Sequence, residues 1–240
     1  MEAIINAYLN ERIGYRDMLR KLISYKQWLV PVVQQDSDQR PNLIRHNEQI
    51  FLLVYSSAEQ VPPETKTMTI DGNWLFSQLE NPIDILVIDP QASYALQFPK
   101  EKFPELKEWA QSLYIESLLE KDEFDAHTLK ELLEFQGYFI PLVESDSGVR
   151  HITLAPDQQQ RKLAAVFTAE DALSLYIQNA QGALGKQILI DRPAGKTLFA
   201  YLLQLPIEGI VFNCYGPGTP RALSKESLQS LLTPLKENDS

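Results

Sequence analysis

The sequences LRKLISYKQWLVPVV (residues 19–33) and LKELLEFQGYFIPLV (residues 129–143) align with each other without a gap. In both, a helical pattern of apolar residues runs into an aromatic residue, two apolar residues and a proline, Pro31 or Pro141. Shorter matches follow in the same order: Val54-Tyr55-Ser56 with Val166-Phe167-Thr168, Leu75-Phe76 with Leu198-Phe199, and residues 82–87 with residues 206–211. A repeat of about 110 residues is too long for a solenoid unit and is typical of a duplicated domain. We therefore predict two tandem copies of one domain, copy 1 at residues 1–120 and copy 2 at residues 121–240.

Length and composition favour a globular intracellular protein. The chain has 240 residues, of which 44% are hydrophobic and 22% charged, as is typical of domains that build their own cores. Its single cysteine, Cys214, cannot form an internal disulfide, and this favours a reducing compartment. The N-terminus has acidic and polar residues where a secretory signal would need a basic start and an apolar core. We therefore expect a cytoplasmic location.

The formal net charge of −10 disfavours two classes of partner. Nucleic acids and anionic membrane surfaces are bound through clustered lysine and arginine side chains, so we expect no nucleic acid and no membrane partner. The sequence also has no run of about 18 apolar residues, so no membrane-spanning helix is expected. Acidity of this size indicates solubility and does not identify a partner by itself.

The alternation of apolar and polar stretches predicts the same elements in each copy. An amphipathic helix and a buried strand come first, followed by a polar excursion and a second strand. Ser56 and Thr168 follow that second strand, each with a carboxylate three residues later, and this spacing predicts a capping box at the start of a helix. Asp71 and Asp191 are the expected caps of the next helix.

A further strand, a turn, a short apolar segment and a last helix complete each copy. Asp89 and Asn213 follow the matching strands, and we expect their side chains to bond the backbone of the turns that come next. Turns rich in glycine, proline and aspartate imply antiparallel pairing within the alternation of strands and helices. The predicted fold class is therefore α+β, as two tandem copies of a mixed β-sheet with flanking helices.

No set of residues in the sequence identifies a reaction. Gly195-Lys196-Thr197 is similar to the end of a phosphate-binding loop, but Ile190 stands where this loop requires a glycine. A catalytic thiol at Cys214 would need a base, and the three histidines lie far from it in predicted loops or linkers. The histidines also lack the spacing of a metal site. We expect no catalytic residue, no cofactor and no metal, and interpret Cys214 as an inert, partly buried thiol.

The second copy carries a longer set of motifs, AVFTAEDAL (residues 165–173), PIEGIVFN (residues 206–213) and ALSKESL (residues 222–228), with GPG between the last two. Together these resemble the SseB-like family, which is named for enhanced serine sensitivity. Cys214 stands where the family usually has proline, and copy 1 has Asp89 in place of the asparagine. The resemblance implies a bacterial protein of undefined biochemical activity, in a family some of whose members lie near secretion or toxin-immunity loci. It supports a binding role and supplies no catalytic residue.

One group of residues in copy 2 has no evident structural role. It comprises a glycine-rich loop and neighbouring strand ends, which would form one rim if the sheet brings them together: Tyr215, Gly216, Gly218, Arg221, Thr168, Asp191 and Arg192. We expect the chain to bind another protein through this rim, as an adaptor, a chaperone-like factor or an immunity factor. The alternative is a small-molecule sensor or enzyme with its site at the rim or in a cleft between domains. A homodimer is also compatible with the sequence.

Overall fold

The computed structural model describes residues 1–35, 38–121, 124–144, 148, 150–155, 159, 161–184, 188–216 and 220–232. It separates into two compact units, Met1–Leu113 and Tyr114–Ser240. The division lies inside helix α4 (Phe103–Leu119), so residues 114–120, which we assigned to copy 1, belong to the second unit. Helices and small mixed sheets occur in both units, and the fold class is α+β as predicted.

The first unit is built around two neighbouring parallel strands, β4 and β6, with β3 and β7 antiparallel on their outer sides. β1 pairs antiparallel with β2 and β5, and a bridge from Leu29 to Tyr55 connects β1 to the end of β4. Its elements in chain order are α1 (Glu2–Leu9), α2 (Tyr15–Ile23), β1 (Trp28–Gln35), β2 (Asp38–Pro41), β3 (Leu43–His46), β4 (Gln49–Val54), η1 (Ala58–Gln60), β5 (Thr67–Ile70), α3 (Gly72–Ser77), β6 (Ile85–Ile88), β7 (Leu96–Pro99), η2 (Lys100–Lys102) and the first part of α4.

The second unit has a parallel pair of the same kind, β10 and β12, with β13 antiparallel beside β12. β8 pairs antiparallel with β9 and β11, and a bridge from Phe139 to Phe167 connects it to the end of β10. Its elements after α4 are α5 (Ala126–Glu134), β8 (Ile140–Glu144), β9 (Arg150–Ile152), β10 (Leu163–Val166), α6 (Glu170–Leu184), β11 (Ile188–Asp191), α7 (Gly195–Gln204), β12 (Gly209–Phe212), β13 (Arg221–Ser224) and α8 (Lys225–Leu232).

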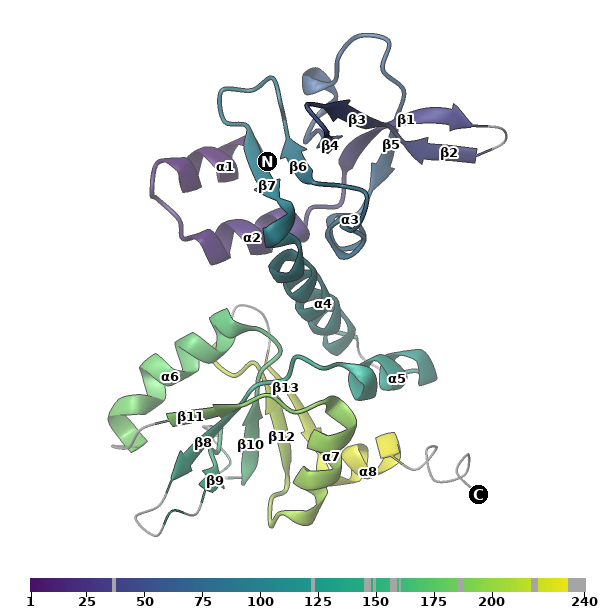
Figure 1. The fold of residues 1–240 in the computed structure, drawn as a ribbon. Helices are drawn as coiled ribbons and strands as arrows, with labels where there is room; N and C mark the ends of the chain where they lie inside the picture. Colours follow the sequence, from purple (N-terminus) through teal and green to yellow (C-terminus); the bar gives the residue numbers. More distant parts are fainter. Residues whose placement is uncertain are drawn as a thin grey trace. The chain divides into compact units, whose positions relative to one another are not determined.

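Both faces of the second unit's strands are covered. Alternate residues of a strand point to opposite faces, and in β10 Ala164 and Val166 join one apolar cluster while Leu163 and Ala165 join another. The first cluster contains buried residues of α5, α7 and α8, and the second contains buried residues of α6. Figure 1 accordingly shows α6 on one side of these strands and α7 and α8 on the other. Burial on both faces explains why β10 consists only of apolar residues.

The two aligned stretches occupy equivalent places in their units. Trp28 donates its indole N–H to the carbonyl of Leu22 at 3.1 Å, and Tyr138 donates its hydroxyl to the carbonyl of Leu132 at 2.9 Å. Both rings are buried, and each bond holds the start of a strand against the preceding helix. The alignment therefore identifies side chains with the same structural role, although the two donors are chemically different.

Of the two predicted helix caps, Asp71 and Asp191, only Asp71 caps a helix. Asp71 caps α3, because its Oδ1 accepts the backbone N–H two residues further on at 2.8 Å. Asp191 does not cap α7, and its Oδ1 accepts the N–H of Arg192 at 2.9 Å. Pro193 disfavours helical backbone at the preceding residue, so α7 begins only at Gly195, too far from Asp191 for a cap.

Candidate binding sites in the second unit

A buried carboxylate joins two strand ends in the first unit. Asp89 follows β6, and its Oδ1 and Oδ2 accept the backbone N–H and the hydroxyl of Ser56, both at 2.7 Å. Ser56 follows β4, the parallel neighbour of β6, and both side chains are buried. The predicted capping role of Ser56 is wrong, because the short helix η1 begins at Ala58 with Ser57 as its N-cap and has no side-chain cap bond. The Ser56 hydroxyl instead donates across the sheet to Asp89. The left-handed backbone of Asp89, at φ 49°, aims the carboxylate toward β4.

An amide replaces this carboxylate in the second unit. Asn213 follows β12 with φ 50°, and its Oδ1 accepts the N–H of Thr168 at 2.9 Å. Its Nδ2 donates to the Thr168 hydroxyl at 2.8 Å, and that hydroxyl donates to Oε1 of Glu116 at 3.3 Å. Thr168 is fully buried. We expected the side chains of Asp89 and Asn213 to bond the backbone of the following turns, whereas both bond the residues that follow the neighbouring strand.

Tyr215 lies just beyond this network and presents an exposed ring. Its backbone is left-handed at φ 67°, a conformation that is unfavourable for a bulky residue, and 47% of its surface is exposed. The next residue packs tightly: a Cβ built on Gly216 would lie 2.7 Å from the Cβ of Ala172, and its N–H donates to the Asn213 carbonyl at 2.8 Å. In the first unit the matching residue is Gln91, which is not left-handed. The turn is therefore held in place while the Tyr215 ring remains accessible.

Four of the predicted rim residues lie at one end of the β10–β12–β13 strands. Thr168, Tyr215 and Gly216 follow β10 and β12, and Arg221 begins β13 opposite Phe212. We call Tyr215, Gly216 and Arg221 the strand-end surface, and Thr168 lies buried beneath it. The Arg221 guanidinium lies 5.5 Å from the centre of the Phe124 ring, so part of this side chain packs against the unit.

The remaining rim residues have different positions. Asp191 and Arg192 lie at the end of β11, where the Arg192 guanidinium stacks 4.5 Å from the centre of the Phe139 ring. Phe139 bridges to Phe167, so this strand end adjoins the residue before Thr168. Gly218 lies outside the described residues.

Cys214, between Asn213 and Tyr215, is buried. Burial raises the pKa of its thiol to about 12, outweighing a backbone hydrogen bond that lowers it. The thiolate is the reactive species, so the protein holds this residue in its unreactive form at neutral pH.

We therefore expect Cys214 to react at least about a hundredfold more slowly with a thiol reagent in the native protein than in urea at pH 8. The physical reason is the small thiolate fraction combined with burial. The measurement is the rate of colour release from the disulfide reagent DTNB in each state. Equal rates in the native protein and in urea would mean that the Cys214 thiol is exposed, and Cys214 would again be a candidate nucleophile.

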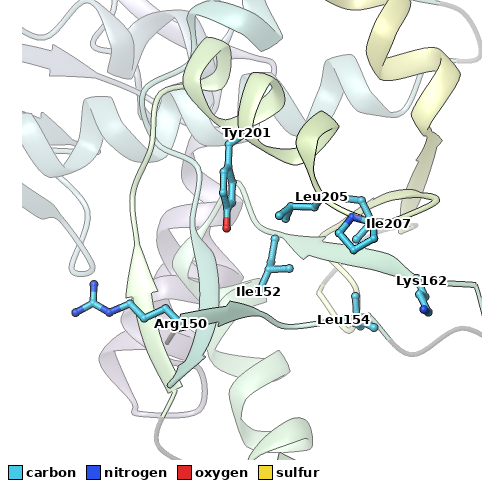
Figure 2. A pocket seen from close by; sticks show the side chains of 8 residues that line it. Arg150, Ile152, Leu154, Lys162, Tyr201, Leu205 and Ile207 are labelled. Atoms are coloured by element: carbon cyan, nitrogen blue, oxygen red, sulfur yellow. The ribbon is translucent and has the colours of Figure 1, made fainter. Parts of the chain in front are cut away.

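A second candidate site is a hollow of about 310 Å³ that the sequence did not indicate. Its walls come from β9, the approach to β10, the end of α7 and the approach to β12. The lining residues are Arg150, Ile152, Leu154, Lys162, Tyr201, Leu205, Pro206 and Ile207. Figure 2 shows the Tyr201 hydroxyl directed toward Ile152, with Arg150 and Lys162 on opposite sides of the hollow.

The charges around the hollow are unevenly distributed. Among the residues that the structure describes, its lining contains two cationic side chains and no acidic one. Nε of Arg150 lies 3.7 Å from Oε2 of Glu144 in an exposed pair, and the Lys162 backbone N–H donates to Glu208 at 2.8 Å. Within the described residues, the Lys162 ammonium group has no hydrogen-bond or ion-pair partner. The hollow therefore combines an apolar lining with a cation that is open to an incoming anion.

Neither a cluster of metal-ligating side chains nor a membrane-spanning helix occurs in the described parts of the chain. These residues contain no cluster of three or more histidine, cysteine, aspartate or glutamate side chains arranged to hold an ion. None of the helices in the same residues is both long enough and apolar enough to cross a membrane.

Comparison with models of known protein families, with curated proteins and with solved structures finds no significant match to this chain.

Proposed function

We propose that this chain is a non-catalytic cytoplasmic protein that acts by binding another protein through the strand-end surface of its second unit. The observation that carries the proposal is the exposed ring of Tyr215, held in a left-handed conformation on a closely packed turn. Backbone strain costs roughly 1–3 kcal/mol, and it is retained where the surrounding structure fixes it and the side chain has a use. Exposed tyrosine on a rigid support is a common anchor of protein interfaces. Membership of the SseB-like family is part of the same proposal.

The environment of the other reactive groups supports binding over catalysis. Cys214 is buried and protonated, and the Asp89 carboxylate already accepts two hydrogen bonds from Ser56. Thr168 is buried between Asn213 and Glu116. These polar side chains hold strand ends together, and this leaves surface recognition as the function that the site supports best.

We expect Tyr215→Ala to reduce recovery of a specific partner at least about tenfold, because truncating a central interface tyrosine typically costs roughly 2 kcal/mol or more. The measurement is affinity purification of the tagged protein from its native lysate, with quantitative mass spectrometry. Trp74→Ala is the matched control, because Trp74 is another exposed aromatic residue, 53% exposed on α3 of the first unit. Partners retained equally by both variants would contradict the proposed surface. Recovery of the folded protein alone would favour a small-molecule function.

A further inference from the structure

The hollow is separate from the strand-end surface. Lys162 precedes β10 and Ile207 precedes β12, whereas Thr168 and Tyr215 follow these strands. An extended chain rises about 3.3 Å per residue, so Lys162 and Thr168 lie roughly 20 Å apart along the sheet. A ligand in the hollow would therefore act independently of a partner at Tyr215.

The apolar lining of the hollow continues the core beneath α7. Ile152 packs against the cluster that contains buried residues of α7. Two residues, Leu154 and Tyr201, remain 45% and 43% exposed where α7 ends and no longer covers the strands. Apolar surface left open at this place is available for a partner's side chain.

The first unit lacks the cation and the tyrosine at the matching positions. The backbone N–H of Ile50 donates to Asp84 at 2.9 Å as that of Lys162 donates to Glu208, so Ile50 is the counterpart of Lys162. Counted from the glycine that begins each helix, Gln78 is the counterpart of Tyr201. α3 has 6 residues and α7 has 10, so α3 supplies less of a wall. Lys162 and Tyr201 are thus particular to the second unit and are not required by the shared pairing of strands.

We propose that this hollow is a docking site for an acidic peptide segment, in which one apolar side chain enters between flanking carboxylates. Charge complementarity carries the choice, since the described residues of the lining include two cations and no acid in a chain of net charge −10, and one of the cations, Lys162, is not in an ion pair with a described residue. The apolar side chain packs on Ile152 and Leu154, and a carboxylate pairs with Lys162. A second carboxylate competes with Glu144 for the exposed Arg150 side chain. The walls of the hollow are partly exposed, as Leu154 and Tyr201 show. An extended peptide suits such a site, because the peptide needs to insert only one of its side chains.

The test is an NMR titration of the ¹⁵N-labelled full chain with a capped probe peptide in which a central leucine is flanked by glutamates. We expect amide shifts at β9, at Lys162 and at the end of α7, and weaker binding at higher salt because the contact is electrostatic. The same peptide with lysines in place of the glutamates, or with serine in place of leucine, should bind at least about threefold more weakly.

Two variants with matched controls locate the contact. Lys162→Glu should raise the Kd of the acidic probe roughly three- to tenfold, while Lys66→Glu, the same charge change at an exposed lysine of the first unit, should leave it unchanged. Leu154→Glu should abolish the shifts, and Ile44→Glu, at an exposed residue of the first unit, should not. Tyr215→Ala should bind the probe normally, so failure here is distinguishable from failure of the proposed strand-end surface.

Three results would overturn the docking site. These are shifts that map away from the hollow, equal affinity for the acidic and basic probes, and insensitivity to both Lys162→Glu and Leu154→Glu. Saturation of the hollow by dodecanoate with no response to the acidic peptide would assign it to an anionic amphiphile instead.

Discussion

Replacing Asp89 by alanine should lower the free energy of unfolding by about 3–7 kcal/mol. The carboxylate is fully buried and accepts both the N–H and the hydroxyl of Ser56. Alanine would leave these two buried donors without an acceptor, at roughly 1–3 kcal/mol each. It would also place a Cβ-bearing residue without local hydrogen bonding in a left-handed conformation, at roughly a further 1 kcal/mol.

Asp89→Asn is the matched control, because the second unit uses this side chain at the same place. There Asn213 accepts the Thr168 N–H with its oxygen and donates its amide to the Thr168 hydroxyl. Asparagine also tolerates the left-handed backbone. We therefore expect Asp89→Asn to cost no more than about 1.5 kcal/mol, at most half the effect of alanine.

Tryptophan fluorescence during urea unfolding measures this difference in the first unit, since all three tryptophans, Trp28, Trp74 and Trp109, belong to it. Circular dichroism of the same samples reports both units. A shift of the midpoint with an unchanged slope would show a change in stability without a change in the unfolded chain. Equal midpoints for Asp89→Ala and the wild type would mean that the bridge to Ser56 contributes little.

The sequence predicted strands well where side-chain pattern determines them. Residues 28–33 are apolar throughout and form most of β1, and the apolar run at residues 163–167 forms β10 and its bridge. These patterns arise from local alternation and burial, which are visible in one stretch of chain. The mixture of parallel and antiparallel pairing was also predictable, because turn residues indicate which neighbours reverse direction.

The roles of Ser56 and Asp89 were not predictable in the same way. A hydroxyl with a carboxylate three residues later has the form of a capping box, yet Ser56 bonds a residue 33 positions further along the chain. The local interpretation failed because parallel strands bring together residues that are distant in sequence. The matched pair Thr168 and Asn213, conversely, was a usable signal, because in each copy a polar residue follows each of two predicted strands.

The hollow was missed for a related reason. Arg150, Lys162 and Tyr201 lie on three separate segments, and none forms a recognisable motif with its sequence neighbours. The strand-end rim was predictable only in part, because Thr168, Tyr215 and Gly216 flank strands that the sequence identifies. The orientation of Arg192 against Phe139 depends on a contact between segments far apart in the chain.

Gly195→Ala should destabilise the second unit by about 2–4 kcal/mol. A Cβ at this position would lie 2.3 Å from the carbonyl oxygen of Leu132 and 2.8 Å from that of Leu133. Both obstacles are backbone atoms of α5, so α5 and α7 would have to move apart. That movement would also strain the hydrogen bond from the Gly195 N–H to the Phe135 carbonyl, which is 2.8 Å long.

Lys196→Ala is the matched control, because it changes the next residue of the same Gly-Lys-Thr sequence without touching the contact between α5 and α7. Lys196 is exposed on the first turn of α7, and we expect its replacement to change stability by no more than about 0.5 kcal/mol. Urea unfolding followed by circular dichroism gives the two energies, and hydrogen exchange with mass spectrometry should locate faster exchange in α5 and α7 for Gly195→Ala. If Gly195→Ala were as stable as the wild type, the close approach of α5 and α7 at this glycine would be wrong. Because close helix packing alone accounts for the glycine, Gly195-Lys196-Thr197 requires no bound phosphate to explain it.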